Sequence, residues 1–401
     1  MCKDAAERLL DSCLKGERWS EALLSQLLSD ECSPDLFQIV AEGLSDRFEP
    51  NLCYTYANLF TQIFAMVEEG LSSRSLMTRY RRIRQPRRFE GLPPERVFVL
   101  SRVTLGADVA ITSVMLDAAK KRFPGSEIVF VGGRKSLELF SADPRITQHV
   151  VDYPRGGSLR DRLGPWKELR TLLSAPRAIT IDPDSRMSQL GLLPICPDEQ
   201  YYFFESRSFG GAGSSTLQSL ARQWANEALG IDDSAAYLSP QTAAIPPERP
   251  FATVSFGVGE NLAKRIGGDF EVRLLRSLIE HNYFVLVDKG AGGEEARRVE
   301  KAIAGAGCAE RIRTWNGAFA PFASMIMQSD LYVGYDSAGQ HVAAAAGVPL
   351  ITIFAGFPSE RMRQRWTPTG PGRIEVIPVY DPSPSTSFDL VNSALDRLAI
   401  S

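Results

Sequence analysis

Hydrophobic side chains recur at two different spacings along this chain. In residues 1–73 they return every three or four positions, as in the apolar stripe of Leu52–Glu69, and this spacing predicts amphipathic helices. From Arg96 onward, short apolar runs alternate with amphipathic stretches, which is typical of strand–helix units around a parallel sheet. We therefore expect a small, acidic helical module followed by α/β structure.

The apolar runs fall into two groups on either side of a proline-rich segment. This segment, residues 239–250, holds prolines that neither continue a helix nor pair well in a sheet. The expected strands before it are Val97–Ser101, Glu127–Val131 and Ala178–Ile181, and those after it are Phe251–Phe256, Tyr283–Asp288, Arg311–Thr314, Leu331–Tyr335, Leu350–Phe354 and Ile374–Val379. Helices are expected at about 108–122, 217–229, 268–281, 293–305, 318–328 and 338–346.

The chain of 401 residues is too long for one typical domain. We expect a helical module over 1–73, a basic connector over 74–95, a first α/β domain over 96–238, a linker over 239–250, a second α/β domain over 251–380 and a terminal segment over 381–401 that holds a helix at Phe388–Ile400.

Composition narrows the class of protein. The net charge of −3 does not point to nucleic acid, and the 44% of hydrophobic residues supports large cores. The six cysteines lack Cys-x-x-Cys spacing, which argues against a zinc ribbon or a disulfide framework and favours a reducing cytoplasm. With three histidines, we expect no metal site. The acidic N-terminus and the lack of long apolar runs predict neither a signal peptide nor a membrane span.

The connector is rich in arginine between Arg74 and Arg88. One interpretation is a solvated linker helix whose arginines pair with the acidic module. The other is a patch that contacts anionic lipid headgroups, at the inner membrane, or an anionic acceptor.

The most informative segment runs from Asp330 to Phe354 and predicts a buried strand, a polar turn, a helix and a second buried strand. Asp336 or Ser337 can cap the helix, and Gly347 can end it. The small residues Ser337, Ala338 and Gly339 would let a ligand approach the backbone N–H groups, where the helix dipole favours an anion. His341 lies about one turn further and could point to the same place. A phosphate-bearing ligand is the natural candidate.

This segment resembles a signature of glycosyltransferase family 9, the ADP-heptose:lipopolysaccharide heptosyltransferases. Asp-Ser-Ala-Gly-Gln-His-Val-Ala-Ala-Ala, starting at Asp336, is similar to Asp-Thr-Gly-Leu-x-His-x-Ala-Ala-Ala. The resemblance extends over about residues 96–380. It implies the GT-B fold, in which two Rossmann-like parallel-sheet domains face a cleft, and a terminal helix that returns to the first domain.

On the first-domain side, Asp108 matches the aspartate that serves the family as catalytic base. A carboxylate beside a sugar hydroxyl can accept its proton as the new bond forms. The alternative is that Asp108 only caps the helix. This chain reads Gly106-Ala107-Asp108, one residue more than the Gly-Asp of the family.

On the second-domain side, the resemblance implies contacts to the diphosphate, the ribose and the base of the donor. Lys264, followed by Arg265, matches the lysine that contacts the donor diphosphate, where a cation neutralises charge on the leaving nucleotide. Glu294 matches the glutamate that binds the ribose, with Glu295 as its neighbour if the register slips. Gly317 lies where the family lines the base pocket. As alternatives, the basic pair is surface charge and the glutamates favour a helix N-terminus.

The resemblance implies an inverting, metal-independent glycosyltransferase without a cofactor. Its donor would be a nucleotide-diphosphate sugar, by resemblance ADP-heptose, and its acceptor a lipopolysaccharide-core sugar or another surface glycan. Two alternatives remain at this point: a sugar-nucleotide 2-epimerase of the same fold, and a non-catalytic binding or scaffold protein.

Overall fold

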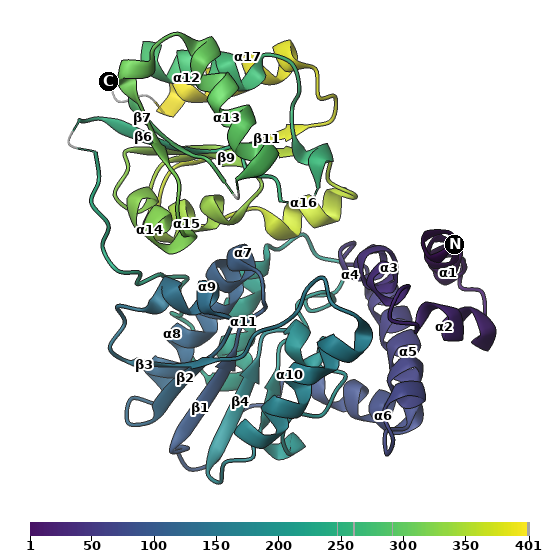
Figure 1. The fold of residues 1–401 in the computed structure, drawn as a ribbon. Coiled ribbons are helices and arrows are strands. Elements are labelled where there is room, and N and C mark those ends of the chain that lie inside the picture. The colour runs from purple at the N-terminus through teal and green to yellow at the C-terminus, as the bar shows by residue number, and fades with distance from the viewer. Residues whose placement is uncertain (247, 260, 291, 399–401) are drawn as a thin grey trace.

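The structure is a computed structural model that describes residues 1–246, 248–259, 261–290 and 292–398. Two α/β domains stand one above the other, and a helical module lies beside the first (Figure 1). The end of the expected terminal helix, beyond Leu398, lies outside the described residues, as does Pro247 of the linker.

Helices build the N-terminal module, as its apolar periodicity predicts. They are α1 (Cys2–Lys15), α2 (Glu21–Leu27), α3 (Ser33–Asp35), a π-helical turn (Leu36–Ala41), α4 (Glu42–Ser45), α5 (Pro50–Val67) and α6 (Ser73–Ile83). The apolar face of α5 packs Phe60 between Phe37, Tyr56 and Phe64. The same hydrophobic cluster continues into one face of the first sheet, through Phe98 and Leu100. The module is therefore joined to the first domain by a shared core.

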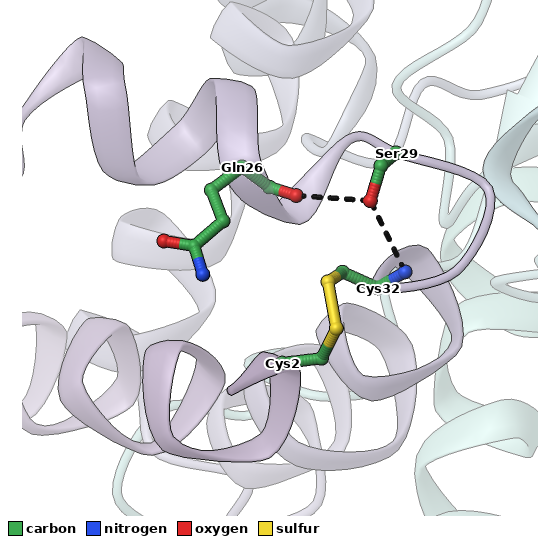
Figure 2. The surroundings of a disulfide bond; sticks show 4 residues. All are labelled: Cys2, Gln26, Ser29 and Cys32. Atoms are coloured by element: carbon green, nitrogen blue, oxygen red, sulfur yellow. Dashed lines mark hydrogen bonds between the residues drawn. A yellow bond between two sulfur atoms is a disulfide. The ribbon is translucent and has the colours of Figure 1, made fainter.

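A disulfide joins Cys2 at the start of α1 to Cys32 at the N-cap of α3 (Figure 2). The turn before Cys32 is held by Ser29, whose hydroxyl donates to the Gln26 carbonyl and accepts from the Cys32 N–H. The expectation from cysteine spacing, which argued against disulfides, is wrong for this pair. The pairing depends on how α1 packs against a turn 30 residues away, and no local spacing records that.

The basic connector folds as α6 up to Ile83 and continues as irregular chain to β1, and several of its arginines contact the first domain. Arg79 donates to Asp198 and to the Gly191 carbonyl, and Arg84 donates to Glu205. Arg87 donates to the Glu199 carbonyl. These partners do not belong to the acidic module. Arg74, Arg81, Arg82, Arg87 and Arg88 are exposed, so contact of this segment with an anionic lipid or acceptor stays a prediction.

The first sheet is parallel, in the order β3-β2-β1-β4-β5. Its strands are β1 (Arg96–Leu100), β2 (Glu127–Gly132), β3 (Ile146–Val150), β4 (Ala178–Asp182) and β5 (Tyr201–Phe203). The helices are α7 (Leu105–Ala107), a π-helical turn (Asp108–Thr112), α8 (Ser113–Arg122), α9 (Arg134–Leu137), α10 (Leu159–Leu172) and α11 (Leu217–Leu229), with 3-10 turns at Glu138–Phe140, Arg186–Ser188 and Asp198–Gln200. The sequence did not predict the two edge strands: β3 has mostly exposed side chains and β5 has three residues.

The second sheet is also parallel, in the order β11-β10-β9-β6-β7-β8. Its strands are β6 (Phe251–Ser255), β7 (Phe284–Asp288), β8 (Ile312–Trp315), β9 (Leu331–Tyr335), β10 (Leu350–Ala355) and β11 (Ile374–Val379). The helices are α12 (Phe270–Glu280), α13 (Gly293–Ala306), α14 (Phe319–Ile326), α15 (Ala338–Ala346), α16 (Glu360–Trp366) and α17 (Pro384–Leu398), with 3-10 turns at Leu262–Lys264 and Ala309–Arg311.

The terminal helix α17 stays on the second domain. It packs mainly on α12, and also against β10 and β11, and Figure 1 shows it at the end of the molecule far from the first domain. The expected return to the first domain is therefore wrong. The apolar side chains Val391, Ala394 and Leu395 join the core of the second sheet, which explains where the helix docks.

The bridge between the domains is α16 instead. Arg361 donates to the Phe48 carbonyl of the helical module over 2.5 Å and to the Gly213 carbonyl over 3.0 Å. Arg365 donates to the Phe209 carbonyl over 3.1 Å. The ring of Trp366 meets that of Phe48 edge-on, with centroids 6.2 Å apart.

Candidate functional site

A cleft of about 480 Å³ lies where the two α/β domains meet. It opens at the carboxyl ends of β1 and β9, where α7 and α15 follow their strands and contact each other (Figure 1). In the second sheet, β6 and β9 are neighbours although they are far apart in sequence, which makes this edge a switch point where α/β sheets bind ligands. Residues of the helical module, Glu42 and Asp46 among them, complete the lining.

Lys264 lines this cleft from the turn Leu262–Lys264 after β6, and its side chain reaches Asp336 at the end of β9. Its Nζ donates to Asp336 Oδ2 over 2.7 Å and to the Asp336 carbonyl over 3.3 Å. The other carboxylate oxygen of Asp336 accepts from Gln340 Nε2 over 2.6 Å, and Gln340 accepts from the Thr352 hydroxyl. This chain of contacts fixes an ammonium group beside the start of α15, where an anion is favoured.

The small residues of the turn before α15 do not all face the cleft. Ser337 is the N-cap residue by position, but its side chain makes no capping hydrogen bond within the described chain, and with Ala338 it lines the cleft. Gly339 is buried, and a Cβ there would overlap the Tyr332 hydroxyl. The space that Gly339 provides is therefore filled by Tyr332 and not by a ligand.

His341 lines the cleft one turn into α15. Only 5% of it is exposed, and burial lowers its pKa to about 4, so the ring is neutral at pH 7. Its Nδ1 has no hydrogen-bond partner among the described residues. A buried ring nitrogen without a protein partner is available to a bound ligand.

The loop after β1 approaches α15 closely from the opposite domain. A Cβ at Gly106 would lie 3.4 Å from the Ala338 Cα and 3.4 Å from His341 Cδ2. Gly106 and the next residue, Ala107, both line the cleft. Where the first domain meets the start of α15, Gly106 has no side chain and Ala107 carries only a methyl group.

Asp108, the expected base, is turned away from the cleft. It is fully buried and accepts from the Ser101 hydroxyl over 2.7 Å, the Arg102 N–H over 2.7 Å and the Thr112 hydroxyl over 2.8 Å. Burial raises its pKa, although these hydrogen bonds act in the opposite direction. A carboxylate so enclosed holds the loop after β1, and its position does not suit proton transfer from an acceptor.

The helix is irregular where the extra residue of this loop stands. Asp108 begins a π-helical turn, Asp108–Thr112, between α7 and α8. A π-type i→i+5 hydrogen bond encloses one residue more than an α-helical bond. Ala107 lies at the cleft, and the carboxylate of the next residue, Asp108, is buried.

Three further expected residues do not line the cleft within the described chain. Arg265 turns toward Glu271, with 3.6 Å between Nε and Oε1. Gly317 lies against the ring of Trp315. Glu294 is exposed in the first turn of α13, as the helix-terminus alternative describes.

Glu295 is better placed than Glu294. A Cβ at Gly257 would lie 2.9 Å from Glu295 Oε1, and one at Gly290 would overlap the same carboxylate. These glycines follow β6 and β7, so the carboxylate packs against the loops at the carboxyl edge of the second sheet.

Sequence reasoning missed the arginines and carboxylates that line the first-domain wall. They are Arg102, Arg155, Arg186 and Arg207, with Glu42 and Asp46 from the helical module. Arg102 and Arg186 each come shortly after a predicted strand, which was an available signal. Arg207 follows the unpredicted β5, and the helical module gave no sign that it reaches the cleft.

The described residues contain no cluster of His, Cys, Asp and Glu side chains arranged to hold a metal ion. In the same part of the chain, every helix is too short or too polar to span a membrane.

Comparison with solved structures identifies the fold. A family 9 glycosyltransferase from Veillonella parvula DSM 2008 has 17% identity and a TM-score of 0.55, with 76% of this chain and 97% of that chain covered. The E. coli heptosyltransferase WaaC, solved with ADP, has 15% identity and a TM-score of 0.56, covering 76% and 100%. The E. coli ADP-heptose lipopolysaccharide heptosyltransferase II has 16% identity and a TM-score of 0.52, covering 75% and 99%. No curated protein matches the sequence.

Two parallel-sheet domains with a cleft at their facing carboxyl edges define the class: this is a GT-B glycosyltransferase fold. Residues 232–379 match the model of glycosyltransferase family 9 (heptosyltransferase), so the chain carries a domain of this family. The predicted family and fold are confirmed. The helical module and most of the first domain precede the matched residues.

Proposed function

We propose that this glycosyltransferase moves heptose from ADP-heptose to a hydroxyl of a lipopolysaccharide-core sugar or another surface glycan, with inversion. The observation that carries the proposal is the placement of Lys264 and Asp336 at the start of α15, in the cleft and within the family 9 segment. Two structures of similar fold were solved with ADP and with ADP-2-deoxy-2-fluoro heptose, which favours the same donor class here.

The second domain would hold the donor. Lys264 and the N–H groups of Ser337 and Ala338 would contact the diphosphate, and Lys264 would neutralise the charge that the leaving ADP gains. Glu295 would accept hydrogen bonds from ribose hydroxyls, in place of Glu294. His341, being neutral, would donate or accept one hydrogen bond without adding charge.

Proton removal from the acceptor needs a base that reaches the cleft. Of the described carboxylates lining it, Asp336 is engaged by Lys264 and Gln340, and Glu42 lies 3.8 Å from Arg186, whereas Asp46 is exposed at the end of α4. Asp46 is therefore our candidate base. As the acceptor oxygen bonds to the anomeric carbon, its proton passes to the Asp46 carboxylate and the bond from that carbon to the ADP oxygen breaks.

A direct test is incubation of the purified chain with ADP-heptose and lipopolysaccharide-core acceptors, followed by mass spectrometry. The expected product is the acceptor with one added heptose and an equal amount of ADP. Lys264→Ala serves as the matched control and should form little product. Release of an epimerised donor without a glycan product would instead support the 2-epimerase.

A further inference from the structure

The first-domain wall of the cleft is strongly cationic. Of the described residues lining the cleft, Arg102, Arg155, Arg186, Arg207 and Lys264 are basic, against the carboxylates Glu42, Asp46 and Asp336. Lys264 and Asp336 already pair with each other on the opposite wall. The remaining arginines all come from the first domain, outside the family 9 segment.

Arg207 is the most firmly held of them. Its Nε and Nη2 donate to the two oxygens of Asp184 over 3.0 and 3.2 Å, which is a bidentate pair. Its guanidinium lies over the ring of Tyr56 in α5, 4.9 Å from the centroid. Burial lowers the pKa of Arg207, but the Asp184 carboxylate outweighs this and the net pKa is raised well above its usual value. The group is a permanent cation in a fixed orientation.

One nitrogen of the Arg207 guanidinium makes no hydrogen bond within the described part of the chain. Arg207 is 2% exposed, and its Nη1 has no hydrogen-bond partner among the described residues. A buried N–H of a charged group is costly when unpaired, so such a group at the wall of a cleft indicates a ligand that accepts from it.

Two neighbouring arginines make long ion-pair contacts with carboxylates, and Arg102 also donates to the Ser206 hydroxyl. Arg102 Nη1 is 4.0 Å from Asp184 Oδ2, and that carboxylate is already shared with Arg207. Arg186 Nη2 is 3.8 Å from Glu42 Oε1, a distance too long for a hydrogen bond. Burial lowers the pKa of Arg186, but the nearby Asp46 carboxylate contributes to a net increase.

From this arrangement we infer that Arg102, Arg186 and Arg207 form an anion-binding subsite opposite Lys264, for a phosphate or carboxylate group of a substrate. The helical module is part of it, because Tyr56 positions Arg207 and Glu42 flanks Arg186. The inference deepens the proposed function, since its ligand is one of the two substrates that would meet in the cleft. The anion is either the diphosphate of the donor or an acidic group of the acceptor.

The test uses inorganic pyrophosphate as the probe and titration calorimetry of the whole chain. Lys264→Ala serves as the background, so that binding to the donor side is weakened. In this background, Arg186→Gln should weaken pyrophosphate binding by roughly 10–150-fold, the equivalent of a hydrogen bond to a charged group. Arg160→Gln, an exposed arginine of α10, is the matched control and should leave affinity unchanged.

Arg207→Lys provides a second measurement, since a lysine keeps the charge but cannot form the same bidentate pair. Thermal unfolding identifies variants that fail to fold, and Arg186 is the safer site because its side chain is 23% exposed. If Arg186→Gln and folded Arg207→Lys both bind pyrophosphate as their background does, the subsite does not exist.

Binding of ADP separates the two sources of the anion. If the donor diphosphate reaches the subsite, Arg186→Gln weakens ADP as it weakens pyrophosphate. If the acceptor supplies the anion, ADP affinity is unchanged and pyrophosphate still binds in the presence of saturating ADP. Neither measurement needs turnover, so a failure of heptosyl transfer with retained pyrophosphate binding would count against the proposed function alone.

Discussion

Both walls of the cleft are formed by the carboxyl edge of a parallel sheet, but they differ in which charged side chains face the cleft and which are buried. At the carboxyl edge of the second sheet, Lys264, Asp336 and His341 line the cleft. At the carboxyl edge of the first sheet, the carboxylates of Asp108, Asp182 and Asp184 are fully buried and hydrogen-bonded within the protein. The groups left facing the cleft on that wall are mainly arginines.

The wall of the second domain lies within the residues that match the family model, and the wall of the first domain lies outside them. The wall within residues 232–379 keeps the features that the resemblance implied, with a lysine and a helix start facing the cleft. The wall outside it uses its acids to hold loops, and the helical module adds Glu42 and Asp46. If the proposed donor contacts are right, a donor wall of the family type is combined here with an acceptor wall of different construction.

The largest effect should come from Asp46→Asn on the acceptor wall. Asparagine cannot take a proton at neutral pH, so turnover should fall by about 10²–10⁴-fold, the usual contribution of a general base. Donor affinity should stay the same, because the donor lies on the other wall. The measurement is turnover with ADP-heptose beside ADP calorimetry on one preparation. Unchanged turnover would remove Asp46 from the mechanism.

On the donor wall, Lys264→Ala should weaken ADP binding by about 1.5–3 kcal/mol, the scale of a hydrogen bond to a charged group. Arg265→Ala is the adjacent control: it removes a cation that faces Glu271, so ADP affinity should barely change. Titration calorimetry of both variants decides the point. Equal losses would mean that net charge, and not the placement of Lys264, attracts the nucleotide.

The buried acids of the first wall should appear in the pH dependence of stability. Burial raises the pKa of Asp182 to about 6 from its ordinary 3.8. A raised carboxyl pKa gives stability that is full below the unfolded pKa and is lost as pH rises through the folded pKa, here by about 3 kcal/mol between pH 4 and 6. Asp182→Asn should flatten this slope in urea unfolding, whereas exposed Asp152→Asn should not. Parallel curves for wild type and Asp182→Asn would contradict the burial effect.

Asp108→Asn should act on stability and not on chemistry. The substitution replaces an acceptor of three hydrogen bonds, and a loss of about 1.5–3 kcal/mol in the free energy of unfolding is expected. Turnover per folded molecule should remain near that of the wild type. A hundredfold loss of turnover in fully folded Asp108→Asn protein would restore Asp108 as the base.

Strands and helices were predicted well where a local pattern of apolar and small residues determines them. The segment from Leu331 to Ala346 forms its strand and helix at the predicted residues, because a buried apolar run and a small-residue turn are both local patterns. Lys264 lines the cleft, since it follows a central strand, and its contact with the donor diphosphate stays a prediction.

Other features depended on packing that no local pattern records. The direction of the Asp108 side chain depends on the hydrogen bonds from Ser101, Arg102 and Thr112 that hold its carboxylate inside the protein. The space at Gly339 was taken by Tyr332 from the preceding strand. The choice between Glu294 and Glu295 rested on one residue of helix register, and the docking of α17 on how its apolar face fits α12.

Because α16 joins the second domain to the first domain and to the helical module, the contacting segments of these three parts should evolve together. Its arginines belong to the family 9 segment, yet they bind main-chain carbonyls of the first domain and of the helical module. A chimera that takes its donor half from a relative would lose this three-way junction unless the glycine-rich loop at 209–215 and the segment around Phe48 were exchanged with it. Changes at Arg361 and Arg365 should therefore accompany changes in those two segments across related sequences, so that the three parts vary as one unit.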